Sequence, residues 1–372
     1  NGMLYASNVN HIFRSQSGDP NTWEKITKSP VPTSLGRLEM AVCQQDPDVI
    51  YCIGAENGGA SSTYVTTDGG QNWAKRARPE NGNGTEFTNG QVWYDLDIAV
   101  DPSDCNHVIT GGVPIRRSQD GAFTWASFGQ GIHVDQHIHL FDEVNPDVIY
   151  FGNDGGVYKV TLENGGATVL NRNQGYNVTQ YYACAMHPDT FSSYFLGGTQ
   201  DNGSHQLNEW NLTSARNVWG GDGFMCHIDQ NEPLIQLVSS QFGNWGVSFN
   251  GGLSFEEGYP VNGGFFNPSD YDDQSNILYT ETGDGDFYRW KVEESSLELV
   301  DITNISHIRV DENTPNRIYI GTGGSLIRVD NAHTGATVTS QSVGTFGGSI
   351  SSVDIERGNP LHLLVTISNY GV

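Results

Sequence analysis

The 372-residue sequence has few charged residues and very few basic ones. Charged side chains make up 16 % of the chain, with 18 Lys or Arg against 43 Asp or Glu. The formal net charge is −25 at pH 7. Nucleic acids and anionic membrane surfaces bind basic faces, so this balance argues against both as partners and favours cation binding.

Long apolar runs are absent too. No stretch approaches the roughly 20 apolar residues that span a bilayer, so we expect no membrane insertion. The sequence shows no signal peptide and does not begin with Met, so we expect any export signal to lie outside this segment. Helix-period patterns of any length are also lacking, which favours an all-β chain.

The five cysteines form neither a CxxC pair nor a zinc-ligand spacing. Cys43, Cys184 and Cys226 fall in predicted first strands of a repeated unit, where small apolar residues are expected. Buried free thiols are therefore the simpler interpretation. A disulfide between Cys43 and Cys52, across their own hairpin, is the alternative.

Glycine is abundant, with 46 residues, and marks a repeated hairpin. The stretch 133–158 reads HVDQHIHLFDEVNPDVIYFGNDGGVY, in which two strands flank an Asn-Pro-Asp turn. Similar hairpins recur at 40–54, 98–112, 307–321 and 353–365. The second strands of these units average about 45 residues apart, the blade period of a β-propeller. They centre on Tyr5, Tyr51, Ile109, Tyr150, Phe195, Gln236, Leu278, Tyr319 and Leu364.

We therefore predict an all-β fold over residues 1–372, a β-propeller of four-stranded antiparallel blades with seven complete blades and partial blades at both ends. The chain opens at 3–7 and closes at 361–368 on the second strand of a blade. Either a seven- or eight-bladed ring closes with a redundant strand, or the chain is part of a larger two-propeller protein. We favour a fragment that is covalently continuous with further blades or domains.

The turns between third and fourth strands carry a specific motif, Ser/Thr-x-Asp-x-(Gly/Ala)-x-x-Trp. Its hydroxyl and carboxylate accept hydrogen bonds from the turn, its Gly takes a positive φ, and its Trp packs between sheets. The acids of this motif are therefore expected to be structural. Full copies consist of Thr66, Asp68, Gly70 and Trp73, and of Ser118, Asp120 and Trp125, while degenerate copies lie at 15–23 and 248–255.

With these motifs the chain resembles the secreted Asp-box (bacterial neuraminidase repeat, BNR) β-propellers, a superfamily of sialidases, xyloglucanase-type glycoside hydrolases and sortilin-like receptors. The series WYDLDIAVDP (93–102), HVDQH (133–137), GNDGGVY (152–158), GGTQDNGS (197–204) and GGDGF (220–224) resembles large exported bacterial BNR-repeat proteins. This resemblance implies a secreted or cell-surface location. The Arg-Ile-Pro motif of sialidases is absent, so the chain does not resemble a typical sialidase.

In a propeller, the loops that enter first strands and the loops that join second to third strands emerge on one face. Acidic loops of these classes lie at 133–135, 152–156, 199–203, 220–223 and 282–286, whereas the Asp boxes lie on the opposite face. Each loop alone is explained as an ordinary Asp-Gly or Asn-Gly turn. Their coincidence on one face predicts a site at the propeller mouth.

The predicted site has three groups of residues. Asp135, Asp154, Asp201 and Asp222 are the candidate catalytic carboxylates, and Trp93, Tyr94, Gln200, Asn202, Trp219 and Trp245 are the candidate ligand-binding residues. Strand alternation would put His133, Asp135 and His137 on one side as a metal set, with hydrogen-bonded histidines between blades as the simpler interpretation. Ca²⁺ on the acidic loops is a further candidate.

Two functions fit these residues. The first is an extracellular binding or scaffold propeller that recognises a glycan or protein partner on the acidic face. The alternative is a glycoside hydrolase that uses two of the Asp carboxylates as acid and base or nucleophile.

Overall fold

The computed structural model describes residues 2–164, 166–176, 178–208, 214–258, 263–281, 287–294 and 296–368. The chain divides into two compact units, Asn1–Asn177 and Val178–Val372. Over the described ranges, regular structure consists of β-strands and one 3-10 turn, η1 (Gln241–Gly243). The predicted all-β class is confirmed.

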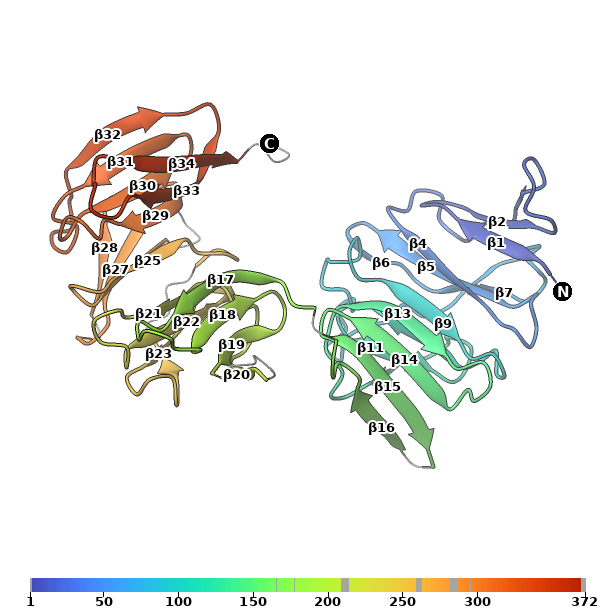
Figure 1. The fold of residues 1–372 in the computed structure, drawn as a ribbon. Coiled ribbons are helices and arrows are strands. Elements are labelled where there is room, and N and C mark those ends of the chain that lie inside the picture. Colours follow the sequence, from blue (N-terminus) through green and yellow to red (C-terminus); the bar gives the residue numbers. More distant parts are fainter. Residues whose placement is uncertain are drawn as a thin grey trace. The chain divides into compact units, whose positions relative to one another are not determined.

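The first unit holds a three-stranded sheet followed by three sheets whose strands pair in chain order, with β6 as a side strand on β5 (Figure 1). Its strands are β1 (Leu4–Ser7), β2 (Ile12–Ser15), β3 (Glu24–Lys25), β4 (Leu38–Val42), β5 (Ile50–Glu56), β6 (Gly59–Ala60), β7 (Tyr64–Thr66), β8 (Ala74–Lys75), β9 (Asp97–Val100), β10 (Val108–Gly111), β11 (Ile115–Ser118), β12 (Ala126–Phe128), β13 (Gln136–Phe141), β14 (Val148–Asn153), β15 (Gly156–Glu163) and β16 (Gly166–Asn171).

The second unit holds four four-stranded sheets and a final strand pair. Its strands are β17 (Tyr181–Met186), β18 (Phe195–Thr199), β19 (Gly203–Leu207), β20 (Arg216–Trp219), β21 (Cys226–Ile228), β22 (Gln236–Ser240), β23 (Asn244–Ser248), β24 (Glu256–Glu257), β25 (Ser269–Asp272), β26 (Ile277–Glu281), β27 (Phe287–Lys291), β28 (Ser296–Val300), β29 (Ile305–Val310), β30 (Ile318–Thr322), β31 (Ser325–Val329), β32 (Ser340–Thr345), β33 (Ser349–Ile355) and β34 (Leu363–Ser368).

Each predicted second strand is a strand of the structure at the predicted place in its sheet. Tyr51 lies in β5 and Leu278 in β26, and the other seven centres lie in β1, β10, β14, β18, β22, β30 and β34. Some of these strands are covered on both faces, as in β26, where all five residues are buried.

Apolar clusters fill the spaces between successive sheets. In the first unit, Ile50 and Trp73 pack toward the β1–β3 sheet, while Tyr51 and Ile53 pack toward the β9–β12 sheet. The first strands β4, β9 and β13 follow one another side by side, as do β25, β29 and β33 in the second unit (Figure 1). Four-stranded antiparallel sheets stacked face to face in this way are propeller blades, which confirms the predicted architecture. The closure of the blades into a ring stays a prediction.

The Asp boxes form closed local turns. Thr66 Oγ1 accepts the Gly70 N–H at 2.9 Å, and Asp68 Oδ1 accepts the Asn72 N–H at 2.8 Å. Gly70 has φ +89°, and the Trp73 indole is buried and donates to the Ile26 carbonyl at 2.8 Å. These hydrogen bonds hold the pKa of Asp68 down at about 2, with the Asn72 backbone as the main cause.

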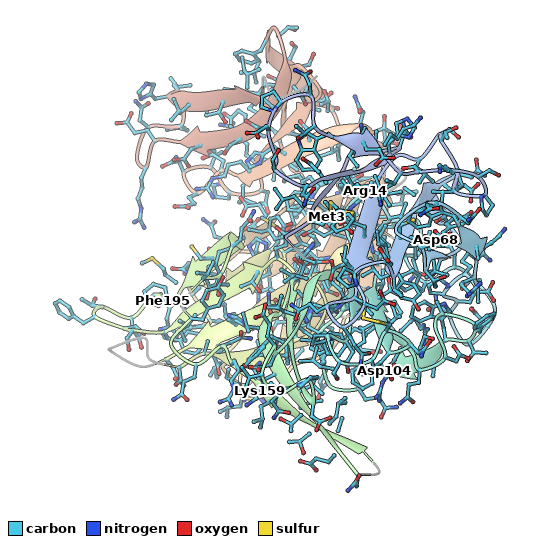
Figure 2. All side chains as sticks on the ribbon, turned by 90° about the vertical axis from the view of Figure 1, so that its right-hand side faces the viewer. Met3, Arg14, Asp68, Asp104, Lys159 and Phe195 are labelled. Atoms are coloured by element: carbon cyan, nitrogen blue, oxygen red, sulfur yellow. A yellow bond between two sulfur atoms is a disulfide. The ribbon has the colours of Figure 1, made fainter. Side chains whose placement is uncertain are left out.

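The second full copy repeats this geometry. Ser118 Oγ accepts the Ala122 N–H at 2.8 Å, and Asp120 Oδ1 accepts the Thr124 N–H at 2.9 Å. Trp125 Nε1 donates to the Ala77 carbonyl at 3.2 Å. The degenerate copies retain the hydroxyl bond, from the Gly18 N–H to Ser15 and from the Gly252 N–H to Ser248. Figure 2 labels Asp68 on the first unit.

Both interpretations of Cys43 were wrong, because it is neither a free thiol nor bonded to Cys52. Cys43 bonds Cys105, with Cα atoms 5.5 Å apart. Cys52 lies opposite Met40 in the ladder and packs on the other face of its sheet from Cys43, so the two thiols do not meet. The bridge therefore joins two successive sheets. Cys226 is a buried free thiol as predicted, whereas Cys184 is exposed.

Candidate functional site

The loop that enters β9 is held by one arginine. Arg37 donates to the Tyr94 carbonyl and to the Leu96 carbonyl, both at 2.7 Å. Its Nε donates to Glu39 at 2.8 Å. The guanidinium therefore fixes the backbone on both sides of Asp95. Its hydrogen bonds go to these three partners and to the Trp93 carbonyl.

Asp95 is fully buried at 0 % exposure. Neither of its carboxylate oxygens has a hydrogen-bond partner within the described chain. Burial, and next the negative charge of Asp135, raises the pKa of Asp95 to about 8. Sequence reasoning missed this residue, although it lies in the WYDLDI stretch, because no turn or spacing rule separates Asp95 from the neighbouring Asp97.

Asp154 lies in the turn between β14 and β15 and is nine-tenths buried. The Tyr94 hydroxyl donates to its two oxygens at 3.1 and 3.2 Å, and His137 Nε2 lies 2.6 Å from Oδ1. The rings of Tyr94 and His137 meet edge to face, with centroids 4.8 Å apart. Two aromatic side chains thus orient this carboxylate.

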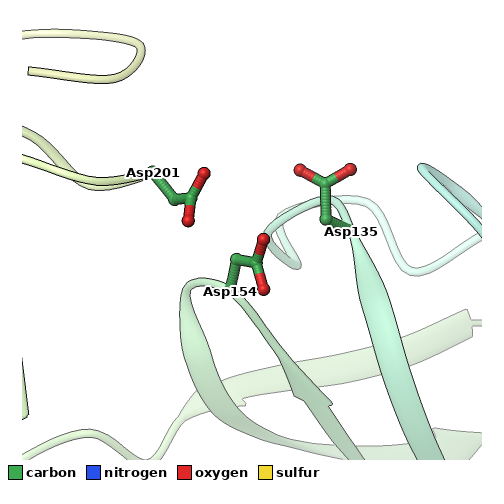
Figure 3. A group of neighbouring side chains, drawn as sticks. All are labelled: Asp135, Asp154 and Asp201. Carbon is green, nitrogen blue, oxygen red and sulfur yellow. The ribbon is translucent and has the colours of Figure 1, made fainter. Parts of the chain in front are cut away.

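Asp135 directly precedes β13 and has a left-handed backbone, with φ 62°. Its N–H donates to the Val113 carbonyl at 2.9 Å, and its carbonyl accepts the Asp154 N–H at 3.3 Å. One carboxylate oxygen of Asp135 lies within 4.8 Å of one of Asp154. Figure 3 shows these two side chains next to each other; Asp201, also drawn there, belongs to the second unit.

The predicted His133–Asp135–His137 metal set does not form. Strand β13 begins only at Gln136 and has an irregular register before Ile138, so strand alternation does not reach back to His133. His133 Nδ1 lies 3.0 Å from the Val134 carbonyl, and His137 turns to Asp154. Over the described ranges, neither histidine joins Asp135 in a group of three close potential ligands.

Trp93 is the exposed aromatic of this site. Its side chain is 73 % exposed, and its ring centroid lies 5.5 Å from that of Tyr94. Large aromatic side chains usually bury most of their surface. A solvent-exposed Trp next to an ordered Tyr and carboxylates is therefore typical of a ligand-binding surface.

Two of the predicted carboxylate residues, Asp201 and Asp222, lie together in the second unit. Asp222 is 8 % exposed, and its Oδ1 accepts the Asp201 N–H at 2.8 Å. The Asp222 N–H donates to Gln241 at 2.9 Å. Asn202 donates to the Gln200 carbonyl at 3.1 Å, so both residues belong to the same turn.

The two predicted tryptophans of this unit differ. Trp219 lines a pocket of about 500 Å³ together with Gln241 and Trp245. The Trp245 side chain is 2 % exposed and packs among Leu237 and Leu278 in a core cluster. Its expected role at the aromatic edge stays a prediction.

The predicted carboxylates therefore form two pairs, one in each unit. The interpretation that all four line one depression stays a prediction, and the acidic loop 282–286 lies outside the described residues.

The fold defines a β-propeller-type protein, and the acidic and aromatic groups of its first unit are a candidate site. Among the residues described, no helix is long and apolar enough to cross a membrane. Comparison with protein-family models finds no match, and neither does comparison with curated proteins.

Solved structures give distant matches. A GH74 enzyme from Niastella koreensis is 14 % identical, with 99 % of this chain and 68 % of that chain covered and a TM-score of 0.37. The GH74 xyloglucanase from Xanthomonas campestris is 14 % identical, with 99 % and 62 % covered and a TM-score of 0.35. Sqt1 from Chaetomium thermophilum is 12 % identical, with 88 % and 92 % covered and a TM-score of 0.41. Similarity at this level assigns neither an activity nor a partner.

Proposed function

We propose that this chain is a binding module that recognises a glycan on the surface formed by Trp93, Tyr94, Asp135, His137 and Asp154, here called the aromatic–acidic surface. The observation that carries the proposal is the 73 % exposed Trp93 beside carboxylates that the fold already orients. A pyranose presents an apolar face, which stacks on an indole, and hydroxyls, which donate to carboxylates.

Preorganisation supports this function. Arg37 fixes the backbone from Trp93 to Leu96, and Tyr94 and His137 hold Asp154, so little side-chain entropy would be lost when a ligand binds. A glycan therefore suits this surface better than a flat protein partner, which would call for a wider apolar patch.

The test is a glycan array with the purified chain, followed by affinity measurements on the best ligand. Trp93→Ala should weaken binding at least about tenfold, since stacking of one aromatic ring contributes on the order of 1–3 kcal/mol in related aromatic contacts. Phe191→Ala is the matched control, because Phe191 is 85 % exposed on the second unit. Equal losses in both variants, or an array without a ligand, would count against the proposal.

We also propose a secreted or cell-surface location. The Cys43–Cys105 bridge supports it, because disulfides persist mainly in oxidising compartments. Fractionation of the source cells, with the chain detected by antibody, tests this; a cytosolic protein with five reduced thiols would contradict it.

Glycoside hydrolysis is a second candidate, favoured by one pair of acids. One carboxylate oxygen of Asp135 lies no more than 4.8 Å from one of Asp154, and glycosidases act through such a pair of neighbouring carboxyl groups. Any ligand found on the array is incubated with the chain and the products are analysed. Turnover that disappears in Asp154→Asn favours hydrolysis, and an intact ligand after long incubation favours binding alone.

A further inference from the structure

Exposed aromatic side chains gather on the loops of the second unit. The buried Phe224 ring lies 5.3 Å from the Phe265 ring and 5.4 Å from the Phe266 ring, centroid to centroid. The Tyr182 ring lies 4.6 Å from Phe224, and the Phe242 ring lies 6.1 Å from Phe265. Apart from Phe224, these side chains are 39–56 % exposed. Single exposed aromatic residues are ordinary, but a contiguous group marks a binding surface. We call Tyr182, Phe242, Phe265 and Phe266 the aromatic patch.

The backbone holds Phe242 in a strained conformation. Its φ is 65°, in the left-handed region that a bulky side chain rarely adopts. Two hydrogen bonds fix it there: its N–H donates to the Gly264 carbonyl at 3.0 Å, and its carbonyl accepts the Gly263 N–H at 2.8 Å. The strained backbone carries a ring that is more exposed than buried. Strain of this kind clusters at functional sites, so the position of this ring indicates contact with a partner.

A pocket continues the aromatic patch. Phe242 lines it together with Trp219, Gln241 and Asn244, and its volume is about 500 Å³. The Trp219 ring packs on Gly246, where a Cβ would lie 2.8 Å from the ring. The Gln241 amide oxygen accepts a backbone N–H at 2.9 Å, and the Asn244 amide donates to the Gln241 carbonyl at 2.8 Å. The pocket therefore combines an aromatic wall with two ordered amide groups, which can both donate and accept hydrogen bonds.

The charges beside the patch are negative. Glu257 is exposed and lines the pocket, and Asp222 lies in the loop that carries Phe224. The segments that form these loops contain no Lys or Arg: 219–225, 240–244 and 263–268. A second copy of this chain, with its net charge of −25, would bring like charges together here. A partner with basic side chains would be attracted.

The shape of the patch distinguishes a polypeptide from a sugar. The rings of Phe224, Phe242, Phe265 and Phe266 meet edge to face, with interplanar angles between 78° and 81°. They form an uneven apolar surface and not the single flat face on which a pyranose stacks. Uneven apolar surfaces with aromatic anchors and a polar rim are typical of protein–protein contacts.

We propose that the aromatic patch and its pocket bind an extended polypeptide segment that carries both apolar and basic side chains. The apolar side chains of this partner contact the patch, its backbone bonds the amides of Gln241 and Asn244, and its Lys or Arg side chains face Glu257. The second unit alone supplies all of these residues. This partner site is independent of the glycan binding proposed for the first unit.

The experiment uses the full chain and three fluorescein-labelled synthetic peptides of equal length. The first alternates Lys with Phe, Leu and Pro, the second has Glu in place of Lys, and the third has Ser in place of the apolar residues. Fluorescence anisotropy should show saturable binding of the first peptide and no binding of the other two at the same concentrations. The affinity for the first peptide should fall several-fold as salt is raised, because exposed charges are screened.

Two pairs of variants locate the binding. Phe242→Ala and Phe265→Ala should each weaken binding of the first peptide at least about tenfold, since a few aromatic anchors dominate such contacts. Phe191→Ala is their matched control, because Phe191 is equally apolar and exposed but lies between β17 and β18. Glu257→Gln should also weaken binding. Glu256→Gln is its control, because Glu256 is the exposed neighbour in β24 that does not line the pocket.

Phe242→Gly separates the strain from the contact. Glycine adopts the left-handed conformation without steric cost, so Phe242→Gly should melt at a higher temperature than Phe242→Ala. Both variants lack the ring, so both should lose peptide binding. Retained peptide binding in a folded Phe242→Gly variant would overturn the proposal.

Other results would also overturn it. Equal affinities for the first and second peptides would exclude a basic partner, and equal losses in Phe191→Ala and Phe242→Ala would exclude the patch. Self-association in sedimentation that disappears in Phe242→Ala would identify a second copy as the occupant, and a glycan ligand lost in the same variant would identify a sugar. Trp93→Ala should leave peptide binding unchanged, so failure of the proposed glycan function would be distinguishable from failure of this partner site.

Discussion

Removal of the Cys43–Cys105 bridge should destabilise the first unit by several kcal/mol. The bridge closes a segment of 62 residues between two successive sheets. Loop-closure entropy for that length predicts a loss of about 4 kcal/mol from the double variant Cys43→Ala/Cys105→Ala. The loss acts through the unfolded chain, so the folded sheets should keep their structure.

Urea unfolding followed by tryptophan fluorescence measures this loss. The oxidised wild type, the wild type in dithiothreitol and the double variant are compared, with Cys52→Ala as the control for removing a buried thiol of the same sheet. The reduced wild type and the double variant should have similarly lowered midpoints, and Cys52→Ala should lose only the smaller amount expected of a small cavity, about 1 kcal/mol. Thiol titration of denatured, unreduced protein should find Cys52, Cys184 and Cys226 free.

Two results would refute this reasoning. Five titratable thiols would show that the bridge does not form. A double variant within about 0.5 kcal/mol of the oxidised wild type would show that loop closure does not limit the unfolded chain.

Three further predictions concern single residues. Asp120→Ala should destabilise the fold by about 1 kcal/mol, because the Thr124 amide loses its acceptor at a solvent-exposed turn. The same variant should leave glycan binding unchanged. A loss of glycan binding at constant melting temperature would contradict a structural role for Asp120. Trp73→Ala should cost about 3–5 kcal/mol in urea unfolding, because a buried indole and its bond to Ile26 are lost, and a cost below 1 kcal/mol would show that the ring is not a core element. Burial, and next the positive charge of Arg309, lowers the pKa of His227 to about 4 from an ordinary 6.5. Between these two pKa values the unfolded chain binds more protons than the folded chain, so the free energy of unfolding should fall as the pH drops from 6.5 to about 4. His227→Gln should show a shallower fall than the wild type between pH 7.5 and pH 4.5, and equal slopes would contradict this assignment.

Local patterns predicted the blades well. The hairpins of β13–β14 and β29–β30 form where the sequence repeats them, because turn chemistry and strand propensity act over a few neighbouring residues. The Asp boxes at Asp68 and Asp120 are equally local, since each acid bonds a backbone amide four residues away. Such features need no knowledge of distant parts of the chain.

The prediction for His133 and His137 failed because it assumed that strand β13 extends back to His133. Alternation would have aligned His133 with His137, but the left-handed Asp135 ends that alternation before β13 begins. The aromatic character of Trp245 predicts a ligand platform, and only the packing of two sheets decides which of its faces is covered. Hydrophobic side chains look alike in a sequence whether they bind a ligand or fill a core.

The sequence by itself determined the all-β class, the order of the blades, the Asp-box turns and the loops on which Asp135, Asp154, Asp201 and Asp222 lie. Only the tertiary structure decided that Cys43 pairs with Cys105 and that Asp95 is buried. The reason is physical. Turns and strands depend on interactions between residues a few positions apart, whereas disulfides and buried charges depend on which side chains from separate sheets share one space, and that is set when the sheets pack.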